Sequence, residues 1–145
     1  NFVKSALPEN DIKKARFIVK GLLKADVKKI MGSKYNKIIF TYWHGDNKTV
    51  WILNSIGKYK PITTGVVVNN CSIEKINVLV YREQIGYEIK YPRFLKQFDN
   101  IKLNKLKLEK NIDNISGATL SVRSMDRMAR LALLLNSNID GGKCA

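Results

Sequence analysis

Residues 10–31 place apolar side chains three or four positions apart, with lysines on the opposite side. This spacing is typical of an amphipathic helix that lies on a core. We expect Asn10 to cap the start of the helix and Gly32 to end it. Because Asp26 would fall within the apolar face, we expect a break there, followed by a second short helix; a single bent helix is the alternative.

Two pairs of β-rich segments follow. The first pair comprises residues 37–43 and 48–54, which are rich in β-branched and aromatic side chains and flank a four-residue loop of turn formers. The second pair comprises residues 62–68 and 73–82, which lie on either side of two asparagines. Each pair predicts a β-hairpin, and two consecutive hairpins predict an antiparallel sheet.

The last third of the chain returns to helical spacing. Residues 92–99 begin with proline and predict a short amphipathic helix, and the lysine-rich residues 102–110 predict a strand edge or a loop. Residues 119–136 predict a C-terminal helix. Its apolar face carries Val122, Met125, Met128, Ala129, Ala132 and Leu133, and Arg123, Arg127 and Arg130 lie on the opposite, solvated side. This order of elements predicts an α+β fold, with an antiparallel sheet built from hairpins and packed against N-terminal and C-terminal helices.

The length of the chain, 145 residues with 45% hydrophobic side chains, suits one domain with a core of its own. We expect residues 1–45 to form an accessory helical region with the first strand, residues 46–136 to form the main core, and residues 137–145 to form a tail. No apolar run approaches the roughly 18 residues of a membrane-spanning helix. The chain begins with Asn1 rather than methionine, and a removed export signal is one explanation.

Basic residues outnumber acidic residues by 26 to 12, which gives a formal net charge of +14. Twenty of the basic residues are lysines and six are arginines, scattered along the chain. Because proteins that read nucleic acids favour the bidentate guanidinium of arginine, the lysine excess argues against a nucleic-acid partner. A basic surface instead suits acidic electron-transfer partners, anionic lipid or a phosphorylated cofactor; an ordinary solvated surface is the alternative.

The two cysteines, Cys71 and Cys144, are far apart in the sequence and have no metal-binding or redox spacing. The position of Cys144 near the chain end favours two free thiols, and a disulfide, which would suit an exported protein, is the alternative. His44 is the only histidine, so a multi-histidine metal site is excluded and no catalytic triad is evident. We therefore expect no metal site.

The segment DNISGAT, residues 113–119, stands directly before the predicted C-terminal helix. Gly117 permits a tight turn, Ala118 leaves the approach uncrowded, and the first amides of a helix form a site that a phosphate can fill. The alternative is a simple capping turn, in which the hydroxyl of Ser116 or Thr119 accepts from those amides.

DNISGATLS resembles the flavin-attachment motif of the FMN-binding domain family, whose members include the C subunit of the sodium-translocating NADH:quinone reductase and the G subunit of the Rnf complex. In that motif an aspartate stands three residues before Ser/Thr-Gly-Ala-Thr, and residues 113–119 fill every place. The resemblance extends upstream through residues 57–70, 77–89 and 94–98, and covers about residues 50–135. It matches especially the small, stand-alone exported members of the family.

The resemblance implies FMN as a redox cofactor, in many members joined by a phosphoester to the motif threonine, here Thr119. It also implies a separate flavin transferase that makes this bond, without which FMN would bind non-covalently or not at all. Residues 46–136 would then be the flavin-binding core of a periplasmic bacterial protein. The helix N-terminus would stabilise the phosphodiester charge, and Ser116 and Ser121 could donate hydrogen bonds to it.

The residues that we expect to bind the cofactor come from the motif and from candidate ring contacts upstream of it. They are Trp43, Tyr59, Thr63, Thr64, Gly65, Glu83, Ser116, Gly117, Ala118, Thr119, Leu120, Ser121 and Arg123. The aromatic side chains would pack against the ring, and the segment 63–65 would approach its polar edge. Trp51 is a further candidate for the ring, with core packing as the alternative for both tryptophans.

Two charged residues have more specific expected roles. Glu83 would either bond a ribityl hydroxyl of the flavin or pair with Arg82. Arg123 lies one turn into the predicted helix and could reach back to the phosphate, whereas Arg130 is too far along the helix axis. A solvated position is the alternative for Arg123.

These expectations together describe an electron-transfer flavoprotein rather than a stand-alone enzyme, without a catalytic acid, base or nucleophile of its own. Its partner would be a redox protein or a membrane electron-transport complex. The alternative is non-covalent FMN binding, or a cofactor-free accessory module of a membrane or periplasmic redox complex, which would be colourless. A nucleic-acid-binding protein would instead show salt-dependent affinity for DNA or RNA.

Overall fold

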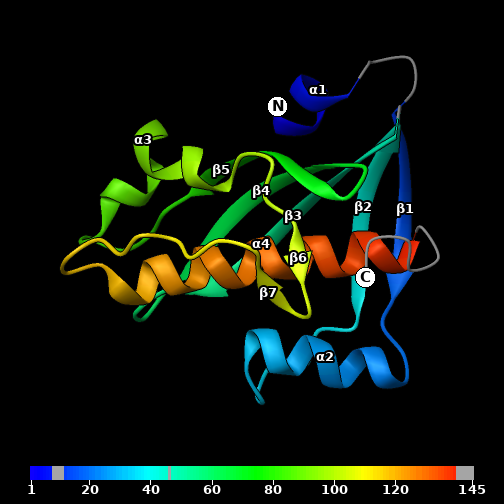
Figure 1. Ribbon diagram of the computed structural model, residues 1–145, viewed down its shortest axis with the longest axis horizontal. Helices are drawn as coiled ribbons and strands as arrows, with labels where there is room; N and C mark the ends of the chain where they lie inside the picture. The colour runs from blue at the N-terminus through cyan, green and yellow to red at the C-terminus, as the bar shows by residue number, and fades with distance from the viewer. Residues whose placement is uncertain (8–11, 46, 140–145) are drawn as a thin grey trace.

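The computed structural model of the chain describes residues 1–7, 12–45 and 47–139. The first and the last element of the chain are helices (Figure 1). They are α1 (Phe2–Ala6), β1 (Lys13–Ile18), α2 (Leu22–Met31), β2 (Ile39–Gly45), β3 (Lys48–Ile56), β4 (Pro61–Asn69), β5 (Ser72–Val80), η2 (Tyr87–Lys90), α3 (Pro92–Leu95), η3 (Lys96–Phe98), β6 (Leu103–Asn104), β7 (Lys107–Leu108) and α4 (Thr119–Ile139).

An antiparallel sheet of five strands, in the order β1-β2-β3-β4-β5, forms the centre of the fold. Both predicted hairpins are confirmed, because β2 pairs with β3 and β4 pairs with β5. β3 and β4 also pair along their whole length, so the turn between them, residues 57–60, lies at one end of the sheet. The sheet and its helices confirm the predicted α+β class.

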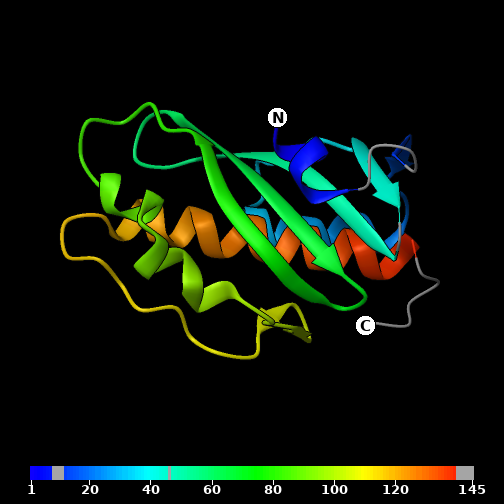
Figure 2. The same ribbon diagram turned by 90° about the horizontal axis from the view of Figure 1, so that it is seen from above.

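Helices cover both faces of the sheet. α4 crosses one face and α2 packs beside it, where both contribute to the main hydrophobic core (Figure 1). On the other face α1 lies against the sheet, and its Val3 joins Val50 and Val67 in a smaller cluster (Figure 2). Alternating residues of β3 therefore face two different cores.

The predicted helix over residues 10–31 is wrong in its first half, where Lys13–Ile18 forms the edge strand β1. In so short a run the helical and the alternating patterns overlap, and pairing with β2 satisfies backbone groups of the segment. α2 follows without an interruption at Asp26, so the expected break is also wrong. Its end at Gly32 is confirmed, and Asn10 lies outside the described residues.

The C-terminal elements agree with the predicted ones in type and order. The short helix over residues 92–99 is present as α3 followed by η3, and the lysine-rich segment forms the small ribbon of β6 and β7. α4 begins at Thr119 as expected and continues past the predicted end at Asn136 to Ile139. Although α4 has 21 residues, no helix in the described ranges is long and apolar enough to cross a membrane.

The apolar stripe of α4 is part of the core, as predicted, and Met125 and Met128 are fully buried. The arginines opposite the stripe differ from one another. Arg123 is exposed, whereas Arg130 donates to the Leu106 carbonyl at 2.7 Å and to the Asp126 carboxylate at 3.2 Å. The expectation of a uniformly solvated face is therefore wrong for Arg130, which ties α4 to the turn between β6 and β7.

A chain of buried hydrogen bonds joins the end of α4 to the sheet. Trp51 Nε1 donates to Thr49 Oγ1 at 2.9 Å, and this hydroxyl donates to Asn136 Oδ1 at 2.7 Å. Asn136 Nδ2 in turn donates to the Asn70 carbonyl at 2.7 Å. Because buried polar groups are costly to leave unpaired, these bonds set the position of α4 along the sheet.

Cys71 follows β4 and is disulfide-bonded, so the expectation of a free thiol is wrong for this residue. Cys144 lies outside the described residues.

Candidate functional site

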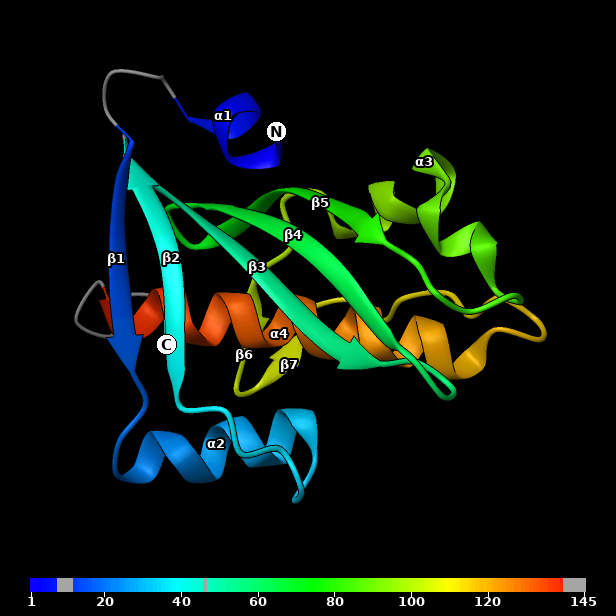
Figure 3. The same ribbon diagram turned by 180° about the vertical axis from the view of Figure 1, so that it is seen from behind.

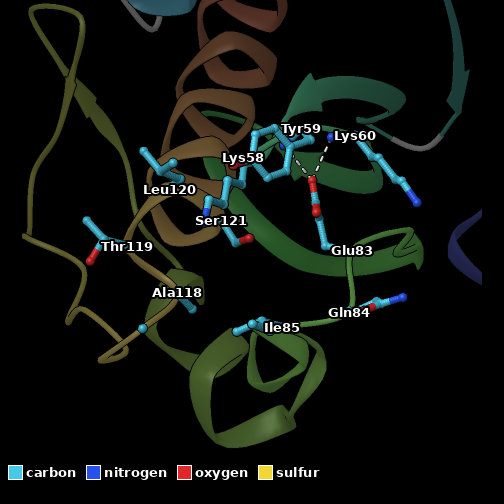
Figure 4. Close-up of a pocket in the computed structure, with 11 residues that line it drawn as sticks. Lys58, Tyr59, Lys60, Glu83, Gln84, Ile85, Ala118, Thr119, Leu120 and Ser121 are labelled. Carbon is cyan, nitrogen blue, oxygen red and sulfur yellow. Dashed lines mark hydrogen bonds between the residues drawn. The ribbon is translucent and has the colours of Figure 1, made fainter.

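A cavity of about 510 Å³ opens at the end of the sheet where α4 begins (Figure 4). Three segments that are far apart in the sequence line this cavity: the turn between β3 and β4, the segment after β5, and the start of α4. We call it the flavin cavity, after the cofactor that the sequence motif leads us to expect. Its lining residues are Lys58, Tyr59, Lys60, Glu83, Gln84, Ile85, Gly117, Ala118, Thr119, Leu120 and Ser121. The first two segments meet because β3, β4 and β5 are neighbours in the sheet, and α4 brings the third segment by crossing it.

Glu83 ties the turn between β3 and β4 to the segment after β5. Its Oε1 accepts hydrogen bonds from the backbone amides of Tyr59 and Lys60, each at 2.6 Å (Figure 4). These bonds lower the pKa of the Glu83 carboxyl from its ordinary value of 4.5, because they stabilise the charged form. The expected pair with Arg82 is not formed, since the Arg82 guanidinium donates to the Pro61 carbonyl at 2.7 Å.

The loop after β5 packs closely against the start of α4. The Tyr81 hydroxyl donates to the Ile85 carbonyl and lies 3.1 Å from Ser121 Oγ. Gly86 has a φ of +90°, and a Cβ at this position would lie 2.6 Å from the Tyr81 hydroxyl and 3.1 Å from Ala118 Cβ. Glycine meets both the backbone and the space requirement, so Gly86 allows the loop to lie against the helix.

Thr119 is the first residue of α4 and is exposed at the cavity. Its Oγ1 accepts a hydrogen bond from the Asn114 side-chain amide at 3.0 Å, and its hydroxyl donates to no other described group. The first amides of a 21-residue helix lack partners within the helix and carry the positive end of its dipole. Gly117, at a φ of +81°, makes the turn into the helix. The hydroxyl is thus held beside a local positive potential and stays open to solvent.

The structure brings part of the expected cofactor-binding set to this cavity. The residues that line it are Tyr59, Glu83, Gly117, Ala118, Thr119, Leu120 and Ser121. Ser116 is exposed and precedes the lining residues. Arg123 does not line this cavity; it lines a neighbouring cavity of about 480 Å³, which shares Thr119 with the flavin cavity.

The segment 63–65, expected at the edge of the ring, lies in β4 and does not line the cavity. Thr64 is fully buried in the core. Thr63 donates its hydroxyl proton to Asn54 Oδ1 at 2.5 Å. Gly65 lies under α1, where a Cβ would be 2.6 Å from the Phe2 ring. Their side chains are therefore occupied with the sheet and with α1.

Both tryptophans lie away from the cavity. Trp51 is fully buried and stacks on Tyr42 with ring centroids 4.8 Å apart, so it packs in the core. Trp43 pairs with Val50 in the register of β2 and β3. The stretch of β3 from Val50 to Ile56 spans about 20 Å at roughly 3.3 Å per residue, and the turn that follows Ile56 lines the cavity. Trp43 therefore lies near the opposite end of the sheet from the cavity.

The sequence analysis missed Lys58, Lys60, Gln84 and Ile85 as lining residues. The only available signal was their position in turns that follow predicted strands, where functional side chains often occur. Ile85 is 71% exposed, an unusual environment for a large apolar side chain in a loop. Which strand ends lie beside the start of α4 depends on the tertiary fold.

Comparisons with known proteins agree with this geometry. The model of the FMN-binding domain family matches residues 57–134, which include all three segments of the cavity. Among solved structures the chain is similar to NqrC of Shewanella oneidensis, with a TM-score of 0.66, 15% sequence identity, and coverage of 90% of this chain and 85% of that chain. This likeness shows a shared fold. No curated protein matches the chain.

The flavin cavity suits FMN in size and in chemistry. Its volume of about 510 Å³ lies within the roughly 300–1,000 Å³ typical of ligand pockets. Tyr59 and Ile85 offer apolar surface for a flat ring, while Lys58, Lys60 and the N-terminus of α4 offer positive charge for a phosphate. Because the family model covers more than half of the chain and the cavity suits the cofactor, the chain belongs to the FMN-binding domain family and FMN is its cofactor.

Proposed function

We propose that the protein is an electron-transfer flavoprotein in which the phosphate of FMN is esterified to Thr119. The observation that carries this proposal is the position of Thr119, an exposed residue that begins α4 and lines the flavin cavity. FMN supplies reversible one-electron and two-electron transfer when it is bound. The chain itself binds the cofactor, orients it and sets the charge around it.

The phosphate of such an ester keeps one negative charge, which the start of α4 would stabilise. The backbone amides of Leu120 and Ser121 lie in the first turn, where helix amides have no partner within the helix. Lys58 and Lys60 line the same cavity, and Arg123 lines the neighbouring cavity together with Thr119. Because these positive groups line the two cavities that share Thr119, they would offset the phosphate charge.

The ring of the flavin would cover large apolar side chains at the cavity. Tyr59 is 75% exposed, Ile85 71% and Leu120 42%, and all three line this one cavity. A group of neighbouring exposed apolar side chains on a protein surface often marks a binding site. The Lys58 ammonium lies 5.2 Å from the centre of the Tyr59 ring, so positive charge would lie near the flavin.

The biological setting belongs to the same proposal. A redox protein or a membrane electron-transport complex would exchange electrons with the flavin, a flavin transferase would make the ester, and the protein would be exported to the periplasm. The net charge of +14 supports an acidic electron-transfer partner, because opposite charge speeds the encounter of two proteins.

Intact-mass spectrometry of protein produced with a flavin transferase tests the linkage. We expect the mass of the chain plus one FMN less one water, since the threonine and the phosphate lose one water overall. The Thr119→Val variant keeps the side-chain shape and lacks the hydroxyl, so it should lose this mass. Thr119→Ser should keep some of it, and the matched control Thr41→Val, in β2 and away from the cavity, should keep it in full.

The same variants separate the ester from reversible binding. Thr119→Val should still bind added FMN, measured by the quenching of free FMN fluorescence, because the cavity and the helix N-terminus are unchanged. Flavin that stays covalently attached to Thr119→Val would refute the ester at Thr119. Wild-type protein with an FMN that dialysis removes, even after production with the transferase, would favour the non-covalent alternative.

A further inference from the structure

A second cavity, of about 540 Å³, lies on the other side of the turn between β3 and β4. We call it the Tyr35 cavity. Its lining residues are Met31, Gly32, Ser33, Lys34, Tyr35, Asn54, Ser55, Ile56, Pro61 and Arg127. The turn residues 58–60 line the flavin cavity, while Ile56 and Pro61 on either side of the turn line this one. The hairpin of β3 and β4 therefore contributes to both cavities.

One wall of the Tyr35 cavity comes from the part of the chain that precedes the family match. Residues 31–35 end α2 and begin the connection to β2, and the family model starts at residue 57. Figure 3 shows α2 beside α4, with the turn between β3 and β4 near the start of α4. The N-terminal region thus closes a cavity against the flavin-binding core.

The cavity combines an apolar lining with two polar groups that lack protein partners. Met31, Ile56 and Pro61 supply apolar surface, and Ile56 is 55% exposed. Among the described residues, neither the Tyr35 hydroxyl nor the Arg127 guanidinium makes a hydrogen bond or an ion pair. Burial raises the pKa of Tyr35 to about 12, so its hydroxyl keeps its proton and remains a donor at neutral pH.

The charges around the cavity select for an anion. Arg127 and Lys34 are the charged lining residues, and within the described ranges no aspartate or glutamate lines the cavity. A guanidinium and a phenolic hydroxyl are donors suited to a carboxylate, and Arg binds this group in a bidentate manner. Ligand pockets typically pair an apolar lining with a few such polar groups.

The wall beside the flavin cavity is held firmly. Ser55 Oγ lies 3.3 Å from Ser124 Oγ, and the Ser124 hydroxyl also donates to the Ile56 carbonyl. These bonds fix the end of β3 on α4, one turn before Arg127 along the helix. The cavity is therefore preformed on this side, which lowers the cost of binding.

We propose that the Tyr35 cavity binds a small carboxylate with an apolar body, with Arg127 and Tyr35 holding the carboxylate and Met31, Ile56 and Pro61 enclosing the apolar part. This site is independent of FMN and of the ester at Thr119. Its occupant would lie across the turn from the flavin, where it could stabilise that turn.

The probe is 2-naphthoate, titrated into FMN-free protein and followed by amide chemical shifts in NMR. A ligand of this size at roughly 0.3 kcal/mol per heavy atom would bind with a Kd of about 1 mM or tighter. We expect saturable shifts at residues 31–35 and 54–56. Arg127→Leu should weaken binding at least about tenfold, as expected for loss of a charged hydrogen-bonding partner, and Tyr35→Phe about two- to tenfold. The uncharged 2-naphthamide should bind more weakly than 2-naphthoate.

The control variant is Arg93→Leu, which removes an exposed arginine that lines neither cavity and should leave the Kd unchanged. Addition of FMN should also leave it unchanged. The proposal is overturned if 2-naphthoate does not bind, if Arg127→Leu binds it as the wild type does, or if FMN competes with it and the shifts map to residues 117–121. These outcomes say nothing against FMN binding itself, which is measured separately.

Discussion

The replacement Gly86→Ala tests whether the loop after β5 lies as close to α4 as the geometry of the flavin cavity requires. The backbone φ of +90° at Gly86 costs an alanine about 1 kcal/mol. The added Cβ would lie 2.6 Å from the Tyr81 hydroxyl, 3.1 Å from Ala118 Cβ and 3.3 Å from Ser121 Oγ. Relief of this overpacking costs about 1–3 kcal/mol more, because Tyr81 is held by its bond to the Ile85 carbonyl.

The sum is a loss of about 2–4 kcal/mol in the free energy of unfolding. At about 2.1 cal/mol/K per residue, 145 residues have an unfolding entropy of about 0.3 kcal/mol/K, so the melting temperature should fall by about 7–13 °C. The assay is thermal unfolding of FMN-free protein by circular dichroism, which separates the folding effect from loss of the cofactor. FMN affinity should fall as well, since the displaced loop carries Gln84 and Ile85.

The matched control is Gly117→Ala, at a φ of +81° with no atom within 4 Å of the new Cβ. It carries the backbone cost alone, about 1 kcal/mol, and should lower the melting temperature by about 3 °C. If Gly86→Ala lowers it no more than Gly117→Ala does, the contact between the loop and α4 is not tight and the reasoning fails.

Three further predictions concern the core, the turn and the ring. Asn136→Leu should lower the free energy of unfolding by about 2–3 kcal/mol, because it leaves the buried Thr49 hydroxyl without its acceptor, and FMN affinity should stay the same. Urea unfolding measures the first quantity and FMN titration the second. An unchanged free energy of unfolding would contradict the role given to the hydrogen bonds of Asn136. The ionised Glu83 carboxylate stabilises its turn above pH 4.5, and this stability is lost as the pH falls through the lowered pKa of the folded protein. The affinity of the wild type for FMN should therefore decrease at pH values below 4.5. The Glu83→Gln variant should bind FMN more weakly than the wild type at neutral pH, and its affinity should not change with pH below 4.5. Parallel pH profiles of FMN affinity for the two proteins would exclude Glu83 as the titrating group. Tyr59→Leu should raise the fluorescence of bound flavin whereas Trp43→Leu should not, and the opposite result would place the ring at Trp43.

The sequence by itself determined the hairpins and the C-terminal helix. Their patterns are local, because alternation over residues 48–54 and the apolar stripe of α4 each follow from the geometry of one element. The motif before α4 likewise placed Thr119 at a helix N-terminus without knowledge of the tertiary fold. β1 was missed because its six residues satisfy two periods at once, and its partner strand decided between them.

The tertiary structure alone decided which side chains line the flavin cavity. Trp43 and Tyr59 are equally good ring partners by residue type, yet the register of β2 and β3 places Trp43 far from α4, while the turn between β3 and β4 carries Tyr59 to it. Glu83 had two plausible partners in the sequence and bonds instead to the backbone amides of that turn. Such choices depend on where strand ends lie in space. That position follows from pairing and packing summed over the whole sheet, so no local pattern encodes it.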